Sequence, residues 1–195
     1  MMQLIYSPTS PYARKCRILV RELALQDVVT EIADNPFEDS ATLLQANPLG
    51  RVPCLVLDDG QALTESGLIS AWLNDRAATP WSSGWDDRRL EALGSGLLDL
   101  AVARRVEMVR DEAIYSSFWL GRRERGILRT LDELERECAT PVEPLSLGGL
   151  TIALAVDYLD FRFPECEWRQ QRPGLAALHG AWAGRASFAA TAPPL

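Results

Sequence analysis

Apolar and polar positions along the first third of the chain follow the patterns of short strands and an amphipathic helix. Residues 3–7 predict a strand, and a Pro-rich turn then leads into a helix with Ser10 at the N-cap and Pro11 in the first helical position. This helix is expected to reach about Leu25, with a buried stripe at helical spacing formed by Cys16, Leu19, Val20 and Leu23. Residues 28–33 predict a second strand, and because a helix separates the two strands, a parallel βαβ unit is expected.

Residues 38–76 carry the patterns of two more strands and two more helices. Asn47-Pro48-Leu49-Gly50 is a turn signal before a strand that is entered through Pro53. The pair Asp59-Gly60 predicts a tight hairpin between antiparallel strands. The expected elements are a weak helix at 38–46, strands at 54–57 and 62–64, and a helix at 68–76 that opens at Glu65-Ser66-Gly67. The order βαβ-ββα is that of a complete small α/β layer.

A Pro-, Ser- and Gly-rich segment at residues 77–84 predicts a linker. Beyond it the apolar residues recur at helical spacing throughout, so an all-α second half is expected. We therefore expect an α/β domain at residues 1–78 and an all-helical domain at residues 84–195. The Ala- and Pro-rich residues 189–194 are expected to lie along the surface.

Charge and apolar runs exclude several classes of function. Twenty Lys and Arg residues against 27 Asp and Glu residues give a net charge of −7, which repels a phosphate backbone, so no nucleic-acid partner is expected. No apolar run approaches the roughly 20 residues that cross a bilayer. The first residues lack the basic and apolar regions of a secretory signal, so the expected location is cytoplasmic, with no membrane partner.

The cysteines, the histidine and the basic residues receive structural interpretations. The four cysteines contain no Cys-x-x-Cys pair, and with His179 as the single histidine no Cys/His metal cluster is expected. Cys16 and Cys54 read as core thiols, and His179 as structural or exposed. One group of basic residues is expected to form a solvated helix face with a secondary attraction for anions: Arg14, Lys15, Arg17 and Arg21.

The order of several motifs carries a family resemblance. Ser10-Pro11-Tyr12-Ala13 stands where glutaredoxins, which share the thioredoxin-like βαβ-ββα arrangement, carry Cys-Pro-Tyr-Cys. Together with the motifs from Asn47 to Pro53 and at Glu65-Ser66-Gly67, and with the helical second half, this chain resembles a bacterial cytosolic glutathione transferase over essentially its whole length. Leu159-Asp160-Phe161-Arg162 and Ser187-Phe188 in the second half are also similar to bacterial members.

The resemblance implies a glutathione transferase fold and an enzyme of detoxification. Glutathione would be the cosubstrate, no metal would be needed, and the glutathione thiolate would be conjugated to a small hydrophobic electrophile. The family usually forms homodimers, so a homodimer is expected. Two alternatives stay open: a non-catalytic glutathione-binding or stress-regulatory protein, and a glutathione-dependent peroxidase or isomerase on the same fold.

The resemblance also assigns glutathione-binding residues. Val52 would pair its backbone with the cysteinyl part of glutathione, as an added strand, and Pro53 would be a cis-proline, although most X-Pro bonds are trans. Ser66 and the amides beside it would bind the γ-glutamyl carboxylate, and Glu65 would meet the γ-glutamyl ammonium. Arg51 would reach the glycine carboxylate, or be a solvated surface residue.

The catalytic assignment is Ser10, whose hydroxyl can donate a hydrogen bond to the glutathione sulfur at a helix N-terminus and so favour the thiolate. Ser10 acting only as a helix cap remains an alternative. Tyr6, Ser7 and Thr9 are alternative hydrogen-bond donors to the glutathione sulfur. Tyr6 can equally be interpreted as an aromatic residue of the core. The electrophile would lie against the helical domain, where the candidates are Trp85, Leu98, Val102, Arg105, Trp119 and Tyr158.

One departure from the family pattern concerns the helix that follows Gly148-Gly149-Leu150. Family members open this helix with a Ser or Thr cap and an aspartate three residues later. Thr151 is expected to be the cap, and Leu154 then stands in place of the acid. The missing carboxylate predicts a helix that is less stable by roughly 1 kcal/mol.

Overall fold

The computed structural model describes residues 1–81, 84–140, 142–143 and 145–194. Contacts group the chain into two compact units, the first comprising Met1–Trp81 with Gly184–Leu195, and the second Ser82–Ala183. Residues 82 and 83 of the predicted linker lie outside the described residues. The domain ranges 1–78 and 84–195 stay a prediction. In the structure, however, the segment from Gly184 onward groups with the first unit.

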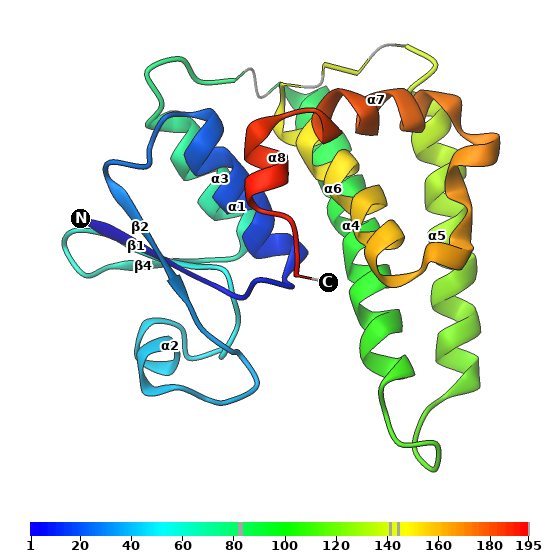
Figure 1. The fold of residues 1–195 in the computed structure, drawn as a ribbon, viewed down its shortest axis with the longest axis horizontal. Helices are drawn as coiled ribbons and strands as arrows, with labels where there is room; N and C mark the ends of the chain where they lie inside the picture. The colour runs from blue at the N-terminus through cyan, green and yellow to red at the C-terminus, as the bar shows by residue number, and fades with distance from the viewer. Residues whose placement is uncertain (82–83, 141, 144, 195) are drawn as a thin grey trace. The chain divides into compact units, whose positions relative to one another are not determined.

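The first unit is the expected βαβ-ββα layer (Figure 1). Its mixed sheet has the order β2-β1-β3-β4, with β1 and β2 parallel and the other neighbours antiparallel. In Figure 1, α1 and α3 lie on one side of the sheet and α2 on the other. The elements are β1 Met2–Tyr6, α1 Pro11–Glu22, β2 Val29–Ala33, α2 Ala41–Ala46, β3 Cys54–Val56, β4 Ala62–Thr64, α3 Ser66–Asp75 and α8 Ala186–Ala190.

Helix α1 begins as predicted, at Pro11 after an N-cap at Ser10, but it ends at Glu22 rather than near Leu25. The reason is a backbone reversal after its last turn. Ala24 has a φ of 54°, its amide bonds the carbonyl of Arg21, and the amide of Leu25 bonds the carbonyl of Val20. This is the Schellman pattern, which satisfies the last carbonyls of a helix and stops it.

The basic residues of α1 do not form a solvated face, and that expectation is wrong. Arg14, Lys15 and Arg17 are 6%, 1% and 8% exposed. Arg17 and Arg21 both hydrogen-bond Glu31 on β2, at 2.8 Å for Nε of Arg17. Burial raises the pKa of Glu31, but the bonds from Arg21 and Arg17 outweigh it and hold that pKa below its usual range. The charges are buried because each has a partner.

Two residues of α1, Arg14 and Glu22, contact the C-terminal segment of the chain. Nη2 of Arg14 donates to the carbonyl of Phe188 at 3.0 Å, and its guanidinium lies 4.2 Å above the Phe188 ring. Near the other end of α1, Nε of Arg185 donates to Glu22 at 2.9 Å. Thr191 is fully buried, whereas the other residues of 189–194 are exposed or half-buried, so this segment lies along the surface except at Thr191.

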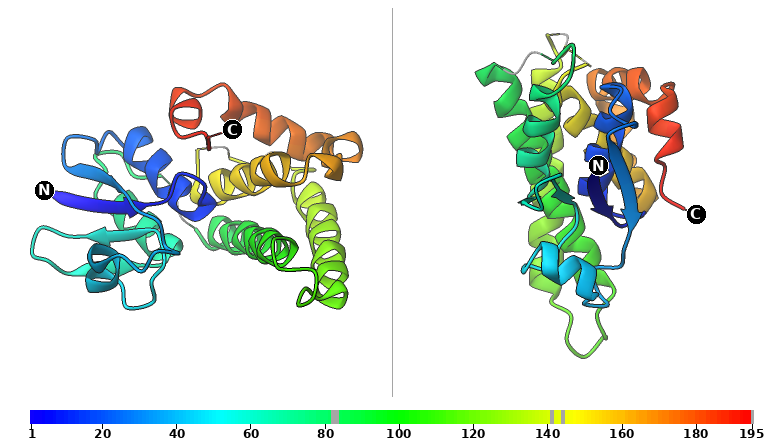
Figure 2. Two further views of the ribbon diagram at one scale, coloured as in Figure 1. Left: turned by 60° about the horizontal axis from the view of Figure 1, so that its bottom comes forward. Right: turned by 90° about the vertical axis from the view of Figure 1, so that its left-hand side faces the viewer.

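The second unit is helical, as predicted, and its elements are α4 Trp85–Met108, α5 Ser117–Glu137, α6 Leu147–Arg162, two short 3-10 turns at Pro164–Cys166 and Trp168–Gln171, and α7 Pro173–Ala183. Helix α6 is buried around almost its whole circumference and packs against α4 and α7, which is the pattern of a central core helix (Figure 2). No helix among the described residues is both long and apolar enough to cross a lipid bilayer.

The N-terminus of α6 differs from the sequence prediction. The cap is Ser146, whose Oγ accepts from the amide of Gly149 at 2.9 Å, whereas Thr151 lies inside the helix and donates to the carbonyl of Leu147 at 2.6 Å. The acid that the capping box lacks is supplied from α4. Asp87 accepts from the amide of Gly148 at 2.9 Å. A Cβ at Gly148 would lie 2.7 Å from the carbonyl oxygen of Asp87, so only glycine permits this approach.

We therefore expect Ser146→Ala to lower the free energy of unfolding by about 1 kcal/mol, because it removes the helix cap. Thr151→Val should cost less, since the carbonyl of Leu147 stays within the backbone ladder of α6. Urea denaturation of the two variants measures the difference. If Thr151→Val lowers the free energy of unfolding more than Ser146→Ala does, Thr151 rather than Ser146 is the cap.

Candidate functional site

Strand register brings the candidate residues of the first unit to one end of the sheet. Cys54 on β3 lies opposite Ile5 of β1 and opposite Thr64 of β4. Continuing both registers two residues beyond Cys54 places Val52 level with Ser7 on one side and with Ser66 on the other. The loops after β1, before β3 and after β4 therefore meet at the same end of the sheet.

Val52 and Pro53 lie at the centre of this arrangement. The peptide bond between them is cis, which confirms the expectation for Pro53, and Pro53 is buried. Val52 is half-buried and packs against the cluster of Ile5, Leu43 and Cys54. Its backbone N–H and C=O bond no other group among the described residues. An extended peptide can therefore pair with Val52 as a strand would.

Asn47 holds the turn that leads to Val52, a role that the sequence analysis missed. Its side chain is 1% exposed, donates to the carbonyl of Arg51 at 2.7 Å and accepts from the amide of Leu49 at 3.1 Å. Gly50 in the same turn has a φ of 61°, which glycine adopts without strain. The sequence carried a signal for this role, since asparagine side chains in turns commonly bond the backbone two residues further on, and Leu49 stands two residues after Asn47.

Glu65 and Ser66 begin α3. Glu65 is its N-cap, with a carboxylate that accepts from the amide of Gly67 at 2.9 Å and from the hydroxyl of Ser66 at 3.2 Å. Its φ of 77° is unusual for a residue other than glycine, and such strained positions cluster at functional sites. Glu65 is exposed, whereas Ser66 is 5% exposed. The pair places a carboxylate beside the amides of a helix N-terminus.

Ser10 occupies the N-cap of α1, as predicted. Its Oγ accepts from the amide of Ala13 at 3.2 Å, so the hydroxyl proton remains available for donation. Among the competing donors, Thr9 is exposed and Ser7 half-buried. The ring of Tyr6 lies 4.1 Å from the guanidinium of Arg17, and the residue is half-buried. The structure is therefore compatible with Ser10 as both a cap and a donor.

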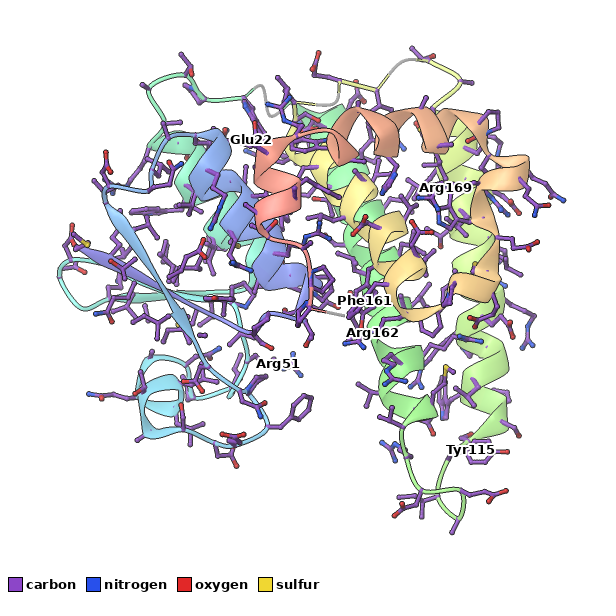
Figure 3. The ribbon with its side chains drawn as sticks, viewed as in Figure 1. Glu22, Arg51, Tyr115, Phe161, Arg162 and Arg169 are labelled. Carbon is purple, nitrogen blue, oxygen red and sulfur yellow. The ribbon has the colours of Figure 1, made fainter. Side chains whose placement is uncertain are left out.

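The remaining candidates have different surroundings. Arg51 is exposed in the loop between α2 and β3, where Figure 3 labels it. In the second unit, Trp85 and Trp119 are 85% and 47% exposed, whereas Leu98 and Tyr158 are buried. Val102 and Arg105 are half-buried on α4.

The cysteines do not have the properties of nucleophiles. Cys16 and Cys54 are buried, and burial raises the pKa of the Cys54 and Cys166 thiols. Burial and the nearby carboxylates of Glu135 and Glu137 raise the pKa of Cys138 to about 11. A thiol with a raised pKa holds little thiolate at neutral pH, so none of these three cysteines is activated.

His179 belongs to an ion-pair network in the second unit. Its Nδ1 lies 3.3 Å from Nη2 of Arg169, which can only donate, so Nε2 carries the proton and donates to Asp157 at 3.0 Å. Asp160 accepts from Arg169 and, at 2.8 Å, from the indole of Trp168. The ligand atoms of Asp157, Asp160 and His179 lie within 4.8 Å of one another. These bonds already occupy the side chains, which indicates a structural role.

Known proteins share both the sequence and the fold. A family model described as glutathione S-transferase, N-terminal domain, matches residues 9–76. The uncharacterized GST-like protein YibF of Escherichia coli K12 is 32% identical over 203 residues, which covers 99% of each chain. The chain therefore belongs to the glutathione S-transferase family, as the resemblance implied.

Solved structures extend the likeness to liganded relatives. A glutathione transferase family member from Pseudomonas fluorescens Pf-5, solved with bound glutathione, is 34% identical and matches with a TM-score of 0.90 over all of both chains. A structure described as a family member from the same strain, with bound S-(propanoic acid)-glutathione, is 32% identical, with a TM-score of 0.85 over all of this chain and 98% of the other. The expected fold class is confirmed.

We expect Asn47→Ala to lower the free energy of unfolding by about 1 to 3 kcal/mol, because the buried side chain of Asn47 then no longer bonds the amide of Leu49 and the carbonyl of Arg51. Asn35→Ala is the matched control: this exposed asparagine donates to Glu38 at 2.7 Å and accepts from the amide of Phe37 at 3.2 Å. Its loss should stay within about 0.5 kcal/mol. Equal losses in chemical denaturation would contradict the role given to Asn47.

Proposed function

We propose that this protein is a glutathione transferase that conjugates the glutathione thiolate to a small hydrophobic electrophile. The observation that carries the proposal is the end of the sheet in the first unit, where Val52, with an unpaired backbone, lies level with Ser7 and Ser66. The relative from Pseudomonas fluorescens with bound glutathione supports glutathione as the cosubstrate.

Each part of glutathione has a proposed partner. The cysteinyl residue pairs with the N–H and C=O of Val52, on the edge opened by Pro53. The γ-glutamyl carboxylate accepts from the first-turn amides at the N-terminus of α3, where the helix dipole favours an anion, and from the hydroxyl of Ser66, whose proton then turns from Glu65 to the ligand. The γ-glutamyl ammonium donates to Glu65, and the exposed guanidinium of Arg51 pairs with the glycine carboxylate.

Ser10 is the proposed thiol-activating residue. Since its Oγ already accepts from Ala13, its proton is free to donate to the glutathione sulfur. This hydrogen bond and the N-terminus of α1 stabilise the thiolate, lowering the thiol pKa from its ordinary value of about 8.5. The sulfur lone pair then forms the bond to the electrophilic carbon. The electron pair displaced from that carbon leaves with a leaving group or is neutralised by a proton, and the thiol proton passes to solvent.

The second substrate and the assembly complete the proposal. A conjugate bound in the second of the two solved structures, S-(propanoic acid)-glutathione, supports a site that accepts a substituent on the sulfur. We place the electrophile against the helical unit, at residues drawn from the candidates named above. A homodimer, as expected from the resemblance, and a cytoplasmic location are part of the same proposal.

Glu65→Gln tests glutathione binding. Glutamine keeps an acceptor for the amide of Gly67 but removes the charge that faces the ammonium, so we expect glutathione affinity to fall by at least about ten-fold with little change in stability. Calorimetric titration with reduced glutathione measures the affinity, and denaturation checks the cap. If the wild-type protein binds no glutathione at millimolar concentration, the proposed function is wrong.

Ser10→Ala tests thiol activation. It should raise the pKa of bound glutathione, because the sulfur loses its donor, and slow conjugation at neutral pH. Ser40→Ala is the matched control, since Ser40 caps α2 by accepting from the amide of Leu43 at 3.1 Å. Both variants should lose about 1 kcal/mol of stability, but only the first should change the thiolate absorbance titration. If the pKa of bound glutathione is unchanged in Ser10→Ala, thiol activation belongs to Tyr6, Ser7 or Thr9 instead.

A further inference from the structure

Helix α5 of the second unit carries a row of arginines on its outer face. Arg122, Arg125 and Arg129 follow one another at intervals of three and four residues, so their side chains lie on one face of the helix. All three are exposed, whereas Ile127 and Leu131 on the opposite face are buried. This arginine row covers about 10 Å along α5, which Figure 1 shows as one continuous helix.

The arginine row has no partner inside the protein. Within the part of the chain that the structure describes, none of its three guanidiniums forms a hydrogen bond, an ion pair or a ring contact. Other arginines of α5 are paired: Arg123 donates to Glu107 at 3.2 Å, and Arg136 forms an ion pair with Glu133. Like charges three and four residues apart destabilise a helix, so the arginine row does not serve the folding of α5.

The acids of α5 leave the arginine row uncompensated and limit the kind of anion that can bind it. Glu124 lies on another face of the helix, 3.7 Å from Arg104. The acids of the second half already bond other groups of the chain: Asp132, Glu133, Glu135 and Glu137. These acids and the net charge of −7 repel a long polyanion that extends beyond the row. A short anionic segment is largely screened from them, because the Debye length is about 8 Å at physiological ionic strength.

An exposed aromatic side chain continues the row toward the start of α5. Phe118 lies four residues before Arg122, on the same face, and is 64% exposed. Its ring contacts that of Trp119 edge to face, at 5.3 Å between centroids. Aromatic residues and arginines are enriched in protein–protein interfaces. This face of α5 therefore offers one apolar contact and three cationic contacts at helical intervals.

We propose that this face of α5 binds an acidic α-helix of a partner protein. A helix with Asp or Glu at intervals of three and four residues presents carboxylates with the same period as Arg122, Arg125 and Arg129. Each carboxylate then meets a guanidinium, whose planar donors match its two oxygens. An apolar residue one turn beyond the acids packs on Phe118. Charge complementarity of this kind sets partner choice and orientation when helices pair.

Two synthetic peptides test the proposal. Each is an alanine-based peptide of about 20 residues with three glutamates and one leucine, held helical by a hydrocarbon staple. In the first peptide the glutamates are three and four residues apart, and in the second they are five residues apart and face different directions. We expect NMR titration of the isotope-labelled protein to show about ten-fold tighter binding of the first peptide, with shifts on α5. Equal binding of the two peptides, or none, overturns the proposal.

Arg125→Gln and Arg136→Gln are the matched variants. Both remove one exposed positive charge from the same face of α5, but Arg125 is unpaired, whereas Arg136 is paired with Glu133. Arg125→Gln should weaken binding of the first peptide by at least about three-fold, and Phe118→Ala should weaken it because the leucine loses its contact. Unchanged binding in either variant contradicts the proposed contacts. If Arg136→Gln weakens binding as much as Arg125→Gln, the preference reflects overall charge and the proposal is wrong.

Other occupants of this face give different results. Tighter binding of single-stranded oligothymidylate or of phosphatidylglycerol vesicles than of the first peptide overturns the proposal in favour of a nucleic acid or a membrane surface. A second copy is recognised from the mass by light scattering. If the wild type is a dimer and the variant with Arg122→Gln, Arg125→Gln and Arg129→Gln is a monomer, this face holds a second copy and the proposal is wrong. None of these measurements uses glutathione, so their outcome is independent of the proposed function.

Discussion

The antiparallel pairing of β3 with both β1 and β4 is the constraint on which the candidate site depends. It places Cys54 opposite Ile5 and Thr64, and so brings together three loops that are far apart in sequence. A shift of one residue would exchange the two faces of β3 and move Val52 out of level with Ser7 and Ser66. The pairing is defined on the core side by Ile5, Leu43 and Cys54, which bury their side chains together.

Much of this arrangement could be predicted from the sequence because it is local. Ser10 followed by Pro11 specifies a helix start, and Asp59-Gly60 specifies a hairpin. Short apolar runs such as residues 54–57 specify the strands. The motifs around Pro53 and Glu65 could be placed in order along the chain, but their meeting in space follows only from strand register. The roles of Ser10, Arg51, Val52, Glu65 and Ser66 toward glutathione remain predictions.

What the sequence did not reveal depends on partners from distant segments. Arg14 and Arg17 read as a solvated face because their partners, Phe188 and Glu31, lie elsewhere in the chain. The cap of α6 was misplaced for the same reason. Thr151 fits the local pattern, but the anion at this helix N-terminus comes from Asp87 on α4. Local patterns therefore located the elements, whereas buried charges depended on tertiary contacts.

Arg14 and Glu22 of α1 bind the segment from Arg185 to Thr191, and these contacts have a consequence for the order in which the protein folds during synthesis. A chain leaves the ribosome from its N-terminus, and domains usually fold in that order. Here α1 lacks its partners for Arg14 and Glu22 until more than a hundred later residues have emerged. The first unit to be synthesised is therefore completed last, and the helical unit can fold before the layer that precedes it is closed.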